Sequence, residues 1–464
     1  MQQFNKSLTS AAVQDAPRNP PRTSGFPVVG SIPGVLRHQT DYLMNAWREH
    51  GDIYTLDLGL VSIVMLNHPD YAQHILRDNL SNYAKGGEMW ASVREVIGDG
   101  LVTSEGNYWR RQRRMIQPHF HRQKLAGLVT LMMEAIDDGM RDWDARAASG
   151  EPFDIAKAYA NITMKVIVRS MFGRALDEHD ADRLGEAMSY ALDYMLKNMV
   201  YGKLPKWMPA PGRNRFHAML EQVDAYLYTL IAQRRLVKDT GDDLLNMFLH
   251  LVDDETGMPL SDKEIRDEAA TIFLAGYETT SIAMTWATFM LTQHQHVTDK
   301  MATQVHDVLG NRTPVFEDLM QLQYPRMVME ETMRLYPPVF WLPRTAVEDD
   351  VIGGYAIKAG QMVAAVPLTI HRHPEFWATP DSFDPENFAP DAAKGRHPQA
   401  WMPFGAGQRL CIGKDFALME GALILSRLMQ RYIVHPVTDQ QPQIALSTTL
   451  TPKDGLWVRL EKRR

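Results

Sequence analysis

The feature that most constrains this chain is its single cysteine, Cys411, which stands in a glycine-rich segment directly before a helical pattern. Residues 404–413 have the sequence FGAGQRLCIG. Glycines permit tight turns and a close approach of the main chain to a bound group. Apolar residues at helical spacing follow from Phe416, which predicts that Cys411 lies at a helix N-terminus, where the dipole lowers the pKa of a thiol. A thiolate held in this way suits iron as a soft ligand.

One cysteine excludes an internal disulfide, a multi-cysteine zinc site and a four-cysteine iron–sulfur cluster. Two alternatives to a metal ligand are a core cysteine in a turn and a dinucleotide-binding loop. Gly405 and Gly407 match the first two glycines of G-x-G-x-x-G, but the third position is Leu410. Residues 399–403 also make a poor strand, whereas the dinucleotide motif requires one before its loop.

A second pattern predicts a long helix with an acid and an alcohol in its middle. A capping box opens it at Ser261, and apolar spacing continues to about Thr292. Residues 275–280 have the sequence AGYETT. Glycine in a helix interior costs on the order of 1 kcal/mol relative to alanine, and threonine hydroxyls bond carbonyls of the previous turn and bend a helix. We therefore expect a weakened helix with room for a diatomic molecule or water.

In that segment Glu278 places a carboxylate beside the Thr279 hydroxyl, a pairing that suits stepwise proton delivery. The alternative is an ordinary helix with one exposed glutamate and two back-bonded threonines.

Three further groups of charged or titratable residues stand out. Glu331 and Arg334 share a helix face at i, i+3 before a Pro-Pro pair ends the helix. Trp109 and Arg113 share a face at i, i+4 in an arginine-rich stretch, which would otherwise be a solvated basic face. Residues 371–373, His-Arg-His, are predicted to form a solvated turn, because the sequence offers no evident third metal ligand.

Composition is that of an ordinary globular protein: 464 residues, 45% hydrophobic, 23% charged and a formal net charge of -7. The charge gives no indication of nucleic-acid binding. No apolar run approaches 18 residues and the N-terminus has no signal-peptide core, so we expect no membrane span and a cytoplasmic location. Residues 1–24 are predicted to be a flexible tail, and residues 25–464 a single domain.

The spacing of apolar residues and glycines predicts a mainly α fold with a small β region built from both ends of the chain. The expected elements are a helix at Thr40–His50 ended by Gly51, strands at Ile53–Leu58 and Val61–Leu66 with a turn at Gly59, mainly helices from Tyr71 to His296, a β-rich patch at Val351–Pro367, and a last helix at Gly413–Tyr432.

Taken together, these motifs resemble the cytochrome P-450 family. The segment 404–413 carries phenylalanine, two glycines, arginine, cysteine and glycine at that family's spacings. Residues 275–280 are similar to its oxygen-activating motif, Glu331 to Arg334 to its E-x-x-R, and Trp109 to Arg113 to its W-x-x-x-R. The resemblance extends from about Gly25 to Leu460 and implies the mostly helical cytochrome P-450 fold.

The resemblance also implies roles for individual residues. Cys411 would be the axial thiolate ligand of haem b (iron protoporphyrin IX), and Glu278 and Thr279 would help bring protons to the dioxygen being activated. Glu331 and Arg334 would be structural, with Asn387 standing where the family usually adds an arginine. The cofactor-binding residues implied are Trp109, Arg113, Ala275, Gly276, Arg344, Phe404, Gly405, Arg409, Cys411 and Gly413, of which Trp109, Arg113, Arg344 and Arg409 would bind the propionates.

The implied activity is that of a monooxygenase, which inserts one atom of O2 into a lipophilic molecule of terpenoid, fatty acyl or polyketide-like type. No reductase region is visible, so we expect a separate ferredoxin or flavodoxin with its reductase, docked on a basic patch of the spare arginines and Lys414, and a monomeric chain. The pocket is expected at residues 85–100, 188–201, 339–342 and 446–450, including Met89, Trp90, Met195, Met199, Phe340 and Trp341. Alternatives are a haem-thiolate peroxygenase or isomerase, and a non-catalytic haem-binding sensor.

Overall fold

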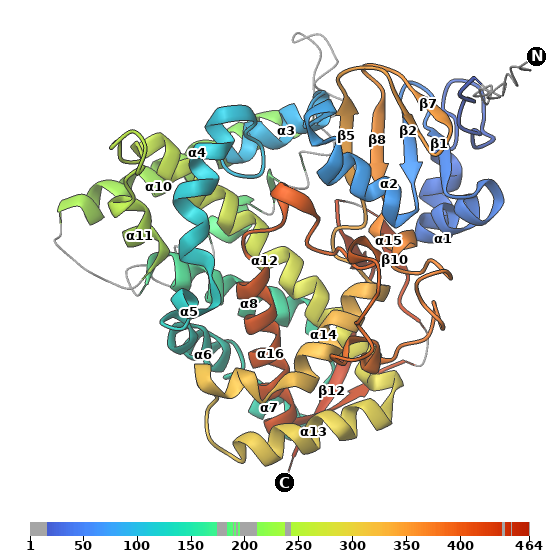
Figure 1. Ribbon diagram of the computed structural model, residues 1–464. Coiled ribbons are helices and arrows are strands. Elements are labelled where there is room, and N and C mark those ends of the chain that lie inside the picture. Colours follow the sequence, from blue (N-terminus) through green and yellow to red (C-terminus); the bar gives the residue numbers. More distant parts are fainter. Residues whose placement is uncertain are drawn as a thin grey trace, which may run out of the picture.

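Helices make up most of this computed structural model, and the largest sheet lies to one side of them (Figure 1). The structure describes residues 16–173, 183–188, 190–191, 194, 211–236, 243–438, 441–446 and 448–463. Its main helices are α1 (Ile32–His50), α2 (Pro69–Gln73), α3 (Glu88–Ile97), α4 (Gly106–Ile116), α5 (Arg122–Leu125), α6 (Leu128–Gly139), α7 (Trp143–Ser149), α8 (Ile155–Phe172), α10 (Arg213–Leu236), α11 (Leu244–His250), α12 (Asp262–Gln293), α13 (Gln295–Leu309), α14 (Gln323–Leu335), α15 (Pro367–Ile370) and α16 (Lys414–Arg431). The predicted mainly α fold with a small β region is confirmed.

The long helix α12 passes through the middle of the helical part (Figure 1). It begins as predicted, because Ser261 Oγ accepts a hydrogen bond from the Glu264 N–H at 3.3 Å and the Ser261 N–H donates to Glu264 Oε2 at 2.8 Å. Most of its residues are buried. Helix α8 packs along it, and an added Cβ on Gly276 would lie 2.8 Å from Ile167 Cδ1. The glycine therefore allows these two helices to approach closely.

A five-stranded sheet joins the two ends of the chain, in the order β1-β2-β8-β5-β3. The predicted hairpin is confirmed: β1 and β2 pair antiparallel from Ile53↔Leu66 to Asp57↔Ser62. Strand β2 then pairs in parallel with β8, which places Ile63 opposite Met362. The strands are β1 (Ile53–Asp57), β2 (Ser62–Leu66), β3 (Tyr83–Ala84), β4 (Phe153–Asp154), β5 (Leu342–Ala346), β6 (Asp350–Ile352), β7 (Tyr355–Ile357), β8 (Met362–Ala365), β9 (Tyr432–Pro436), β10 (Ile444–Leu446), β11 (Leu450–Pro452) and β12 (Trp457–Lys462).

The start of the described chain differs from the predicted flexible tail. Within residues 1–24, Arg18 donates its N–H to the Gly354 carbonyl at 3.0 Å, and Thr23 donates to the Thr55 carbonyl at 3.0 Å. Thr23 is also buried. Residues 18–23 are therefore attached to two sheets, because unpaired backbone groups of β1 in the five-stranded sheet and of β7 in a two-stranded sheet offer them partners.

Other elements were predicted only in part. Helix α1 starts at Ile32, but Gln39 has a non-helical backbone (φ 48°, ψ -123°), so the predicted start at Thr40 is where the helix resumes. Strands β3 and β4 interrupt the stretch that was predicted to be mainly helical. The strands after Tyr432 were not predicted: β10 and β11 have only three residues each, and β12 pairs with β9 and with the distant β4.

A buried ion pair fixes the chain that leads to Cys411. Arg334 and Glu331 side chains are both 0% exposed and meet at 2.7 and 2.8 Å. The remaining guanidinium N–H groups donate to the carbonyls of His371, Pro380 and Ser382 at 3.1, 2.6 and 2.6 Å. All five N–H donors of the arginine are thereby satisfied, as a buried charge requires.

The third member of this network comes from two residues. Asn387 Nδ2 donates to Glu331 Oε1 at 3.2 Å, so the asparagine keeps the contact without the charge. Arg396 lies nearby, with its guanidinium carbon 4.0 Å from the centre of the Trp377 ring and a 2.7 Å hydrogen bond to the Asn387 carbonyl. Its positive charge interacts with Glu331. Arg396 therefore supplies, from nine residues further along, the charge that Asn387 lacks.

The segment held by Arg334 in turn supports the cysteine loop. The prediction of a solvated turn at residues 371–373 is wrong: His371 is 0% exposed and His373 8%. Burial and the Arg334 charge lower the pKa of His371 to about 3, so its neutral ring accepts the Met402 N–H at 2.8 Å. Trp377 Nε1 donates to the Ala400 carbonyl at 3.3 Å. These bonds fix the residues just before 404–413.

We predict that Arg334→Ala destabilises the protein by about 3–5 kcal/mol, because it leaves the Glu331 carboxylate buried without its cation. The measurement is the free energy of unfolding in urea. Lys394→Ala is the matched control, since Lys394 and Asp391 form a pair with the same i, i+3 spacing whose side chains are 78% and 92% exposed. Equal stability of the two variants would contradict the structural role of the buried pair.

Candidate functional site

Cys411 lies in a tight loop directly before α16. The loop closes by a hydrogen bond from the Cys411 N–H to the Phe404 carbonyl at 2.9 Å. Gly405 and Gly407 have φ of 74° and 65°, which only glycine adopts readily. A Cβ on Gly407 would also clash with the carbonyl oxygen of Leu76. Because Gly413 is the N-cap of α16, the cysteine sits at a helix N-terminus as predicted.

The thiol of Cys411 has a raised pKa. The side chain is exposed, yet protein surrounds it densely enough that burial raises the pKa of the thiol. The Gly413 N–H bonds to the sulfur and the Arg113 charge acts on it, and both lower the pKa without reversing the effect of burial. The prediction of a lowered thiol pKa is therefore wrong, because burial outweighs these two neighbours; a coordinated metal ion would be needed for the deprotonation.

Two of the predicted cationic residues, Arg409 and Arg113, lie beside the loop. The Arg409 guanidinium carbon lies 3.9 Å from the centre of the buried Trp109 ring, and its nitrogens bond to the Ser104 carbonyl at 2.9 Å and Glu105 at 3.2 Å. Arg113 Nε donates to Gln117 Oε1 at 2.7 Å, and its charge acts on the Cys411 thiol. Trp109 and Arg113 of α4 thus face the same site as Arg409 of the cysteine loop.

Lys85 is a cation of this site that the sequence analysis missed. Burial and the charges of Arg344 and Arg409 lower its pKa well below the ordinary value. Its Nζ donates to the Val102 carbonyl at 2.5 Å and lies 4.8 Å from the centre of the Trp90 ring. Its type alone gave no indication, because lysine is normally exposed.

Positive charge at this site exceeds the negative charge available. Burial lowers the pKa of Arg344 to about 10, and its NH1 donates to the neighbouring Pro343 carbonyl at 2.7 Å. Lys85, Arg344 and Arg409 all interact with Glu105, the acidic partner found for them among the described residues. Buried cations need compensation. A group with two carboxylates would supply it, so these residues fit a haem with two propionates.

The middle of α12 contributes a second group of the predicted site residues. Ala275 is exposed although the helix is buried on both sides of it, so solvent reaches α12 at this point. Thr279 Oγ1 donates to the Ala275 carbonyl at 2.8 Å, as expected for a back-bonded threonine. The helix nevertheless continues unbroken to Gln293. The Thr279 hydroxyl and Ala275 therefore share one face of α12.

Glu278 is oriented by another part of the chain. Its Oε1 accepts a hydrogen bond from Thr449 Oγ1 at 3.0 Å, and the side chain is half-buried. Thr449 lies between β10 and β11. The acid and the neighbouring alcohol, Thr279, thus have different partners.

Two buried carboxyl groups near this part of α12 were not predicted. Glu420 of α16 is 1% exposed, burial raises its pKa well above the ordinary range, and it bonds to Thr280. Glu268 of α12 accepts the Leu101 N–H at 3.2 Å, and burial raises its pKa to about 8. Both are neutral acids that join helices or loops around the site. Sequence alone gives no indication of such burial.

The predicted pocket segments are only partly described. Phe340 is 5% exposed and belongs to the core beside the sheet, where it stacks on Trp341 with ring centres 5.9 Å apart. Met89 and Trp90 are partly exposed at the start of α3. Met195 and Met199 lie outside the described residues.

The predicted basic patch is smaller than the sequence suggests. Arg111 pairs with Glu264 at 2.6 Å and with Asp253 at 3.4 Å. Arg114 pairs with Asp253 at 2.7 Å. These acids neutralise two of the arginines that were expected to be spare.

Comparison with known proteins gives a consistent result. The family described as cytochrome P450 matches residues 20–458. Cyclooctat-9-en-7-ol 5-monooxygenase of Streptomyces melanosporofaciens is 31% identical over 92% of this chain and 93% of its own length. Pentalenene oxygenase of Streptomyces avermitilis is 28% identical over 94% and 96%. The crystal structure of the cytochrome P450DA heme domain superimposes with a TM-score of 0.88 at 26% identity, over 97% of this chain and 99% of that one.

We predict that Glu268 makes stability decrease with rising pH. Its carboxyl has a pKa of about 8 in the folded chain and an ordinary value of 4.5 when unfolded, so the folded state binds the extra proton. The stabilisation is complete below about pH 4.5 and is lost as pH rises through 8, a change of up to about 5 kcal/mol. Glu268→Gln should abolish this part of the pH dependence in urea unfolding.

The exposed Glu317→Gln serves as the control and should retain the wild-type profile. If the unfolding free energy of Glu268→Gln declined with pH as steeply as that of the wild type, Glu268 would not be a buried neutral acid.

Proposed function

The chain belongs to the cytochrome P450 family and is an oxidoreductase of the monooxygenase type, and from this premise we propose that its Cys411 thiolate binds the iron of haem b and that it oxygenates a lipophilic polycyclic molecule. The observation that carries the proposal is that the cysteine lies at the N-terminus of α16, beside basic side chains that outnumber their acidic partners. The mostly helical fold is the one that this family adopts.

Four side chains, Lys85, Arg113, Arg344 and Arg409, would bind the propionates, and Trp109 would support Arg409. Charge-assisted hydrogen bonds of this kind are strong and directional. When bound, haem supplies the activation of O2 and the oxidation of an unactivated bond. The protein supplies the thiolate ligand, the orientation of the cofactor and control of protons.

We assign the control of proton delivery to two residues of α12. Thr279 lies on the face of α12 that carries the exposed Ala275, and the preceding residue, Glu278, is held by Thr449. General acid catalysis requires a proton donor within hydrogen-bond reach of the reacting group. We assign to the Thr279 hydroxyl the hydrogen bond to the reacting group. We assign the supply of the proton to Glu278.

For the substrate we propose a terpenoid. The names of two relatives specify cyclooctat-9-en-7-ol and pentalenene as the compounds that those proteins oxidise. Trp90 and Trp341 are partly exposed aromatic residues in the predicted pocket segments, and adaptable apolar walls suit such ligands.

Electrons are proposed to come from a ferredoxin or flavodoxin with an acidic docking surface. With Arg111 and Arg114 neutralised, the remaining cations near the cysteine loop include Arg110 and Lys414, which is partly exposed at the start of α16. Attraction between opposite charges would speed the encounter and weaken with salt.

We predict that the reduced protein with carbon monoxide shows the strongly red-shifted Soret band of thiolate ligation, and that Cys411→Ala loses it. The physical reason is that a thiolate donates more electron density to iron than histidine does. Arg344→Ala is the companion variant: it should keep the band but weaken haem binding, because it removes one propionate contact. A red-shifted band that persisted in Cys411→Ala would overturn the assignment.

We predict that Thr279→Ala reduces the coupling of electron consumption to product by roughly 10-fold or more, with hydrogen peroxide formed instead, because proton delivery becomes unproductive. The measurement is peroxide released per electron consumed with a ferredoxin system and a terpene that shifts the haem spectrum. Thr285→Ala is matched, since Thr285 Oγ1 makes the same back-bond, to Ser281 at 2.7 Å, but is buried in the core. Unchanged coupling in Thr279→Ala, or full activity with peroxide alone, would contradict the proton role.

A further inference from the structure

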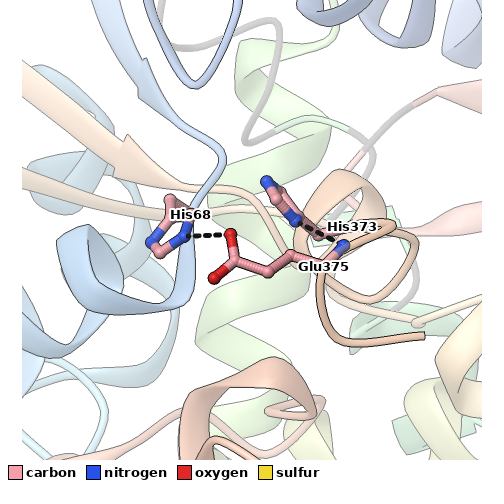
Figure 2. Close-up of side chains that lie close together, drawn as sticks. All are labelled: His68, His373 and Glu375. Atoms are coloured by element: carbon pink, nitrogen blue, oxygen red, sulfur yellow. Dashed lines mark hydrogen bonds and ion pairs between the residues drawn. The ribbon is translucent and has the colours of Figure 1, made fainter.

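Two histidines and a glutamate meet at the surface beside the five-stranded sheet (Figure 2). His68 lies between β2 and α2, whereas His373 and Glu375 follow α15, about 300 positions later in the chain. One ring nitrogen of each histidine and one carboxylate oxygen lie within 4.8 Å of one another. We propose that His68, His373 and Glu375 bind a divalent first-row transition ion such as Zn²⁺.

The spacing of the ligand atoms suits a metal of this size. His68 Nε2 and Glu375 Oε2 are 3.5 Å apart. Zinc bonds of about 2.0–2.1 Å in a tetrahedron separate neighbouring ligand atoms by about 3.3 Å. Figure 2 shows the Glu375 carboxylate turned toward His68, with the His373 ring on its other side. Small side-chain rotations would therefore close the site.

Each histidine has a carboxylate next to the ring nitrogen that faces away from Glu375. Asp52 Oδ1 lies 3.4 Å from His373 Nε2, and Asp70 Oδ2 lies 3.6 Å from His68 Nδ1. Metal-binding histidines usually donate their second N–H to such a carboxylate, which fixes the tautomer and makes the ligand more basic. This arrangement assigns His68 Nε2 and His373 Nδ1 to the metal.

Each histidine ring now accepts a hydrogen bond from a backbone N–H group, and binding of the metal ion would replace these two hydrogen bonds. His68 Nδ1 accepts the Asp70 N–H at 3.2 Å, and His373 Nδ1 accepts the Glu375 N–H at 3.3 Å. Both are long for hydrogen bonds. With the ion bound, the His68 proton would move to Nδ1 and be donated to the Asp70 carboxylate.

The charge of the surroundings also favours a cation. In the part of the chain that the structure describes, the ion pairs of Asp52, Asp70 and Glu375 are all with histidines. A third histidine, His397, pairs with Asp70 at 3.1 Å. Since no lysine or arginine pairs with these three carboxylates among the described residues, their negative charge is available to a cation.

The two rings are already held in place. Their centres are 5.0 Å apart at 88°, and each packs 5.3 Å from the Phe376 ring. Their side chains are only 13% and 10% exposed. Ligands fixed before binding lose little conformational freedom, and this favours affinity. Two imidazoles with one carboxylate are the ligand types that zinc and its neighbours prefer.

The test uses purified, chelator-treated full-length chain and ZnCl₂, with bound zinc measured by equilibrium dialysis and stability by thermal unfolding. We expect one zinc per chain and a thermal midpoint raised by a few degrees, because an ion that joins residues far apart in sequence stabilises the folded state. Glu375→Gln should weaken binding by more than 10-fold. His68→Asn should do the same while keeping the helix cap, since asparagine is a good N-cap.

Two controls separate this site from others. His435→Ala removes an exposed histidine paired with Glu461 at 3.0 Å and should leave binding unchanged. Cys411→Ala should also retain the zinc, which shows that the ion is independent of the cysteine site. The proposal is overturned if the wild type binds no zinc, or if Glu375→Gln and His68→Asn bind it with wild-type affinity; the cluster would then be a set of hydrogen-bonded side chains only.

Discussion

The buried guanidinium of Arg334 is the constraint on which the path to Cys411 depends. A fully buried charge is stable only when its counter-ion and all its donors are satisfied. Glu331 takes two of the five N–H groups, and the carbonyls of His371, Pro380 and Ser382 take the rest. Those three carbonyls can be brought together in only a few ways. The segment that contains them then holds the residues just before the cysteine loop, through bonds to Met402 and Ala400.

On the other side of the cysteine, the basic side chains that the structure describes are not balanced by acidic ones. There Lys85, Arg344 and Arg409 are cations in a buried or partly buried setting, with Glu105 as their acidic partner among the described residues. One network is complete within the protein, whereas the other would be completed by an anion such as the propionates of the proposed cofactor. A cofactor with two carboxylates would therefore contribute to the stability of this region as well as to the chemistry, since its binding relieves repulsion between like charges.

The sequence allowed correct prediction where local chemistry decides the structure. The capping box at Ser261, the glycines around Cys411 and the turn at Gly59 are local features, and α12, the cysteine loop and the β1–β2 hairpin follow them. Prediction failed where a partner far along the chain decides. Short strands such as β3 and β4 have little pattern of their own, and the burial of Lys85, Glu268 and Glu420 arises only when separate elements meet.

The same reasoning explains why residues 371–373 were misjudged. As a sequence, His-Arg-His is polar and suggests a solvated turn, but His371 fills the space beside Arg334 and His373 packs against His68. A similar dependence on distant partners applies to Glu278. The acid is held by Thr449, in a segment predicted to form part of the substrate pocket. A change in that segment would therefore alter the position of the acid, and with the roles proposed above substrate fit and proton supply would be coupled through one hydrogen bond.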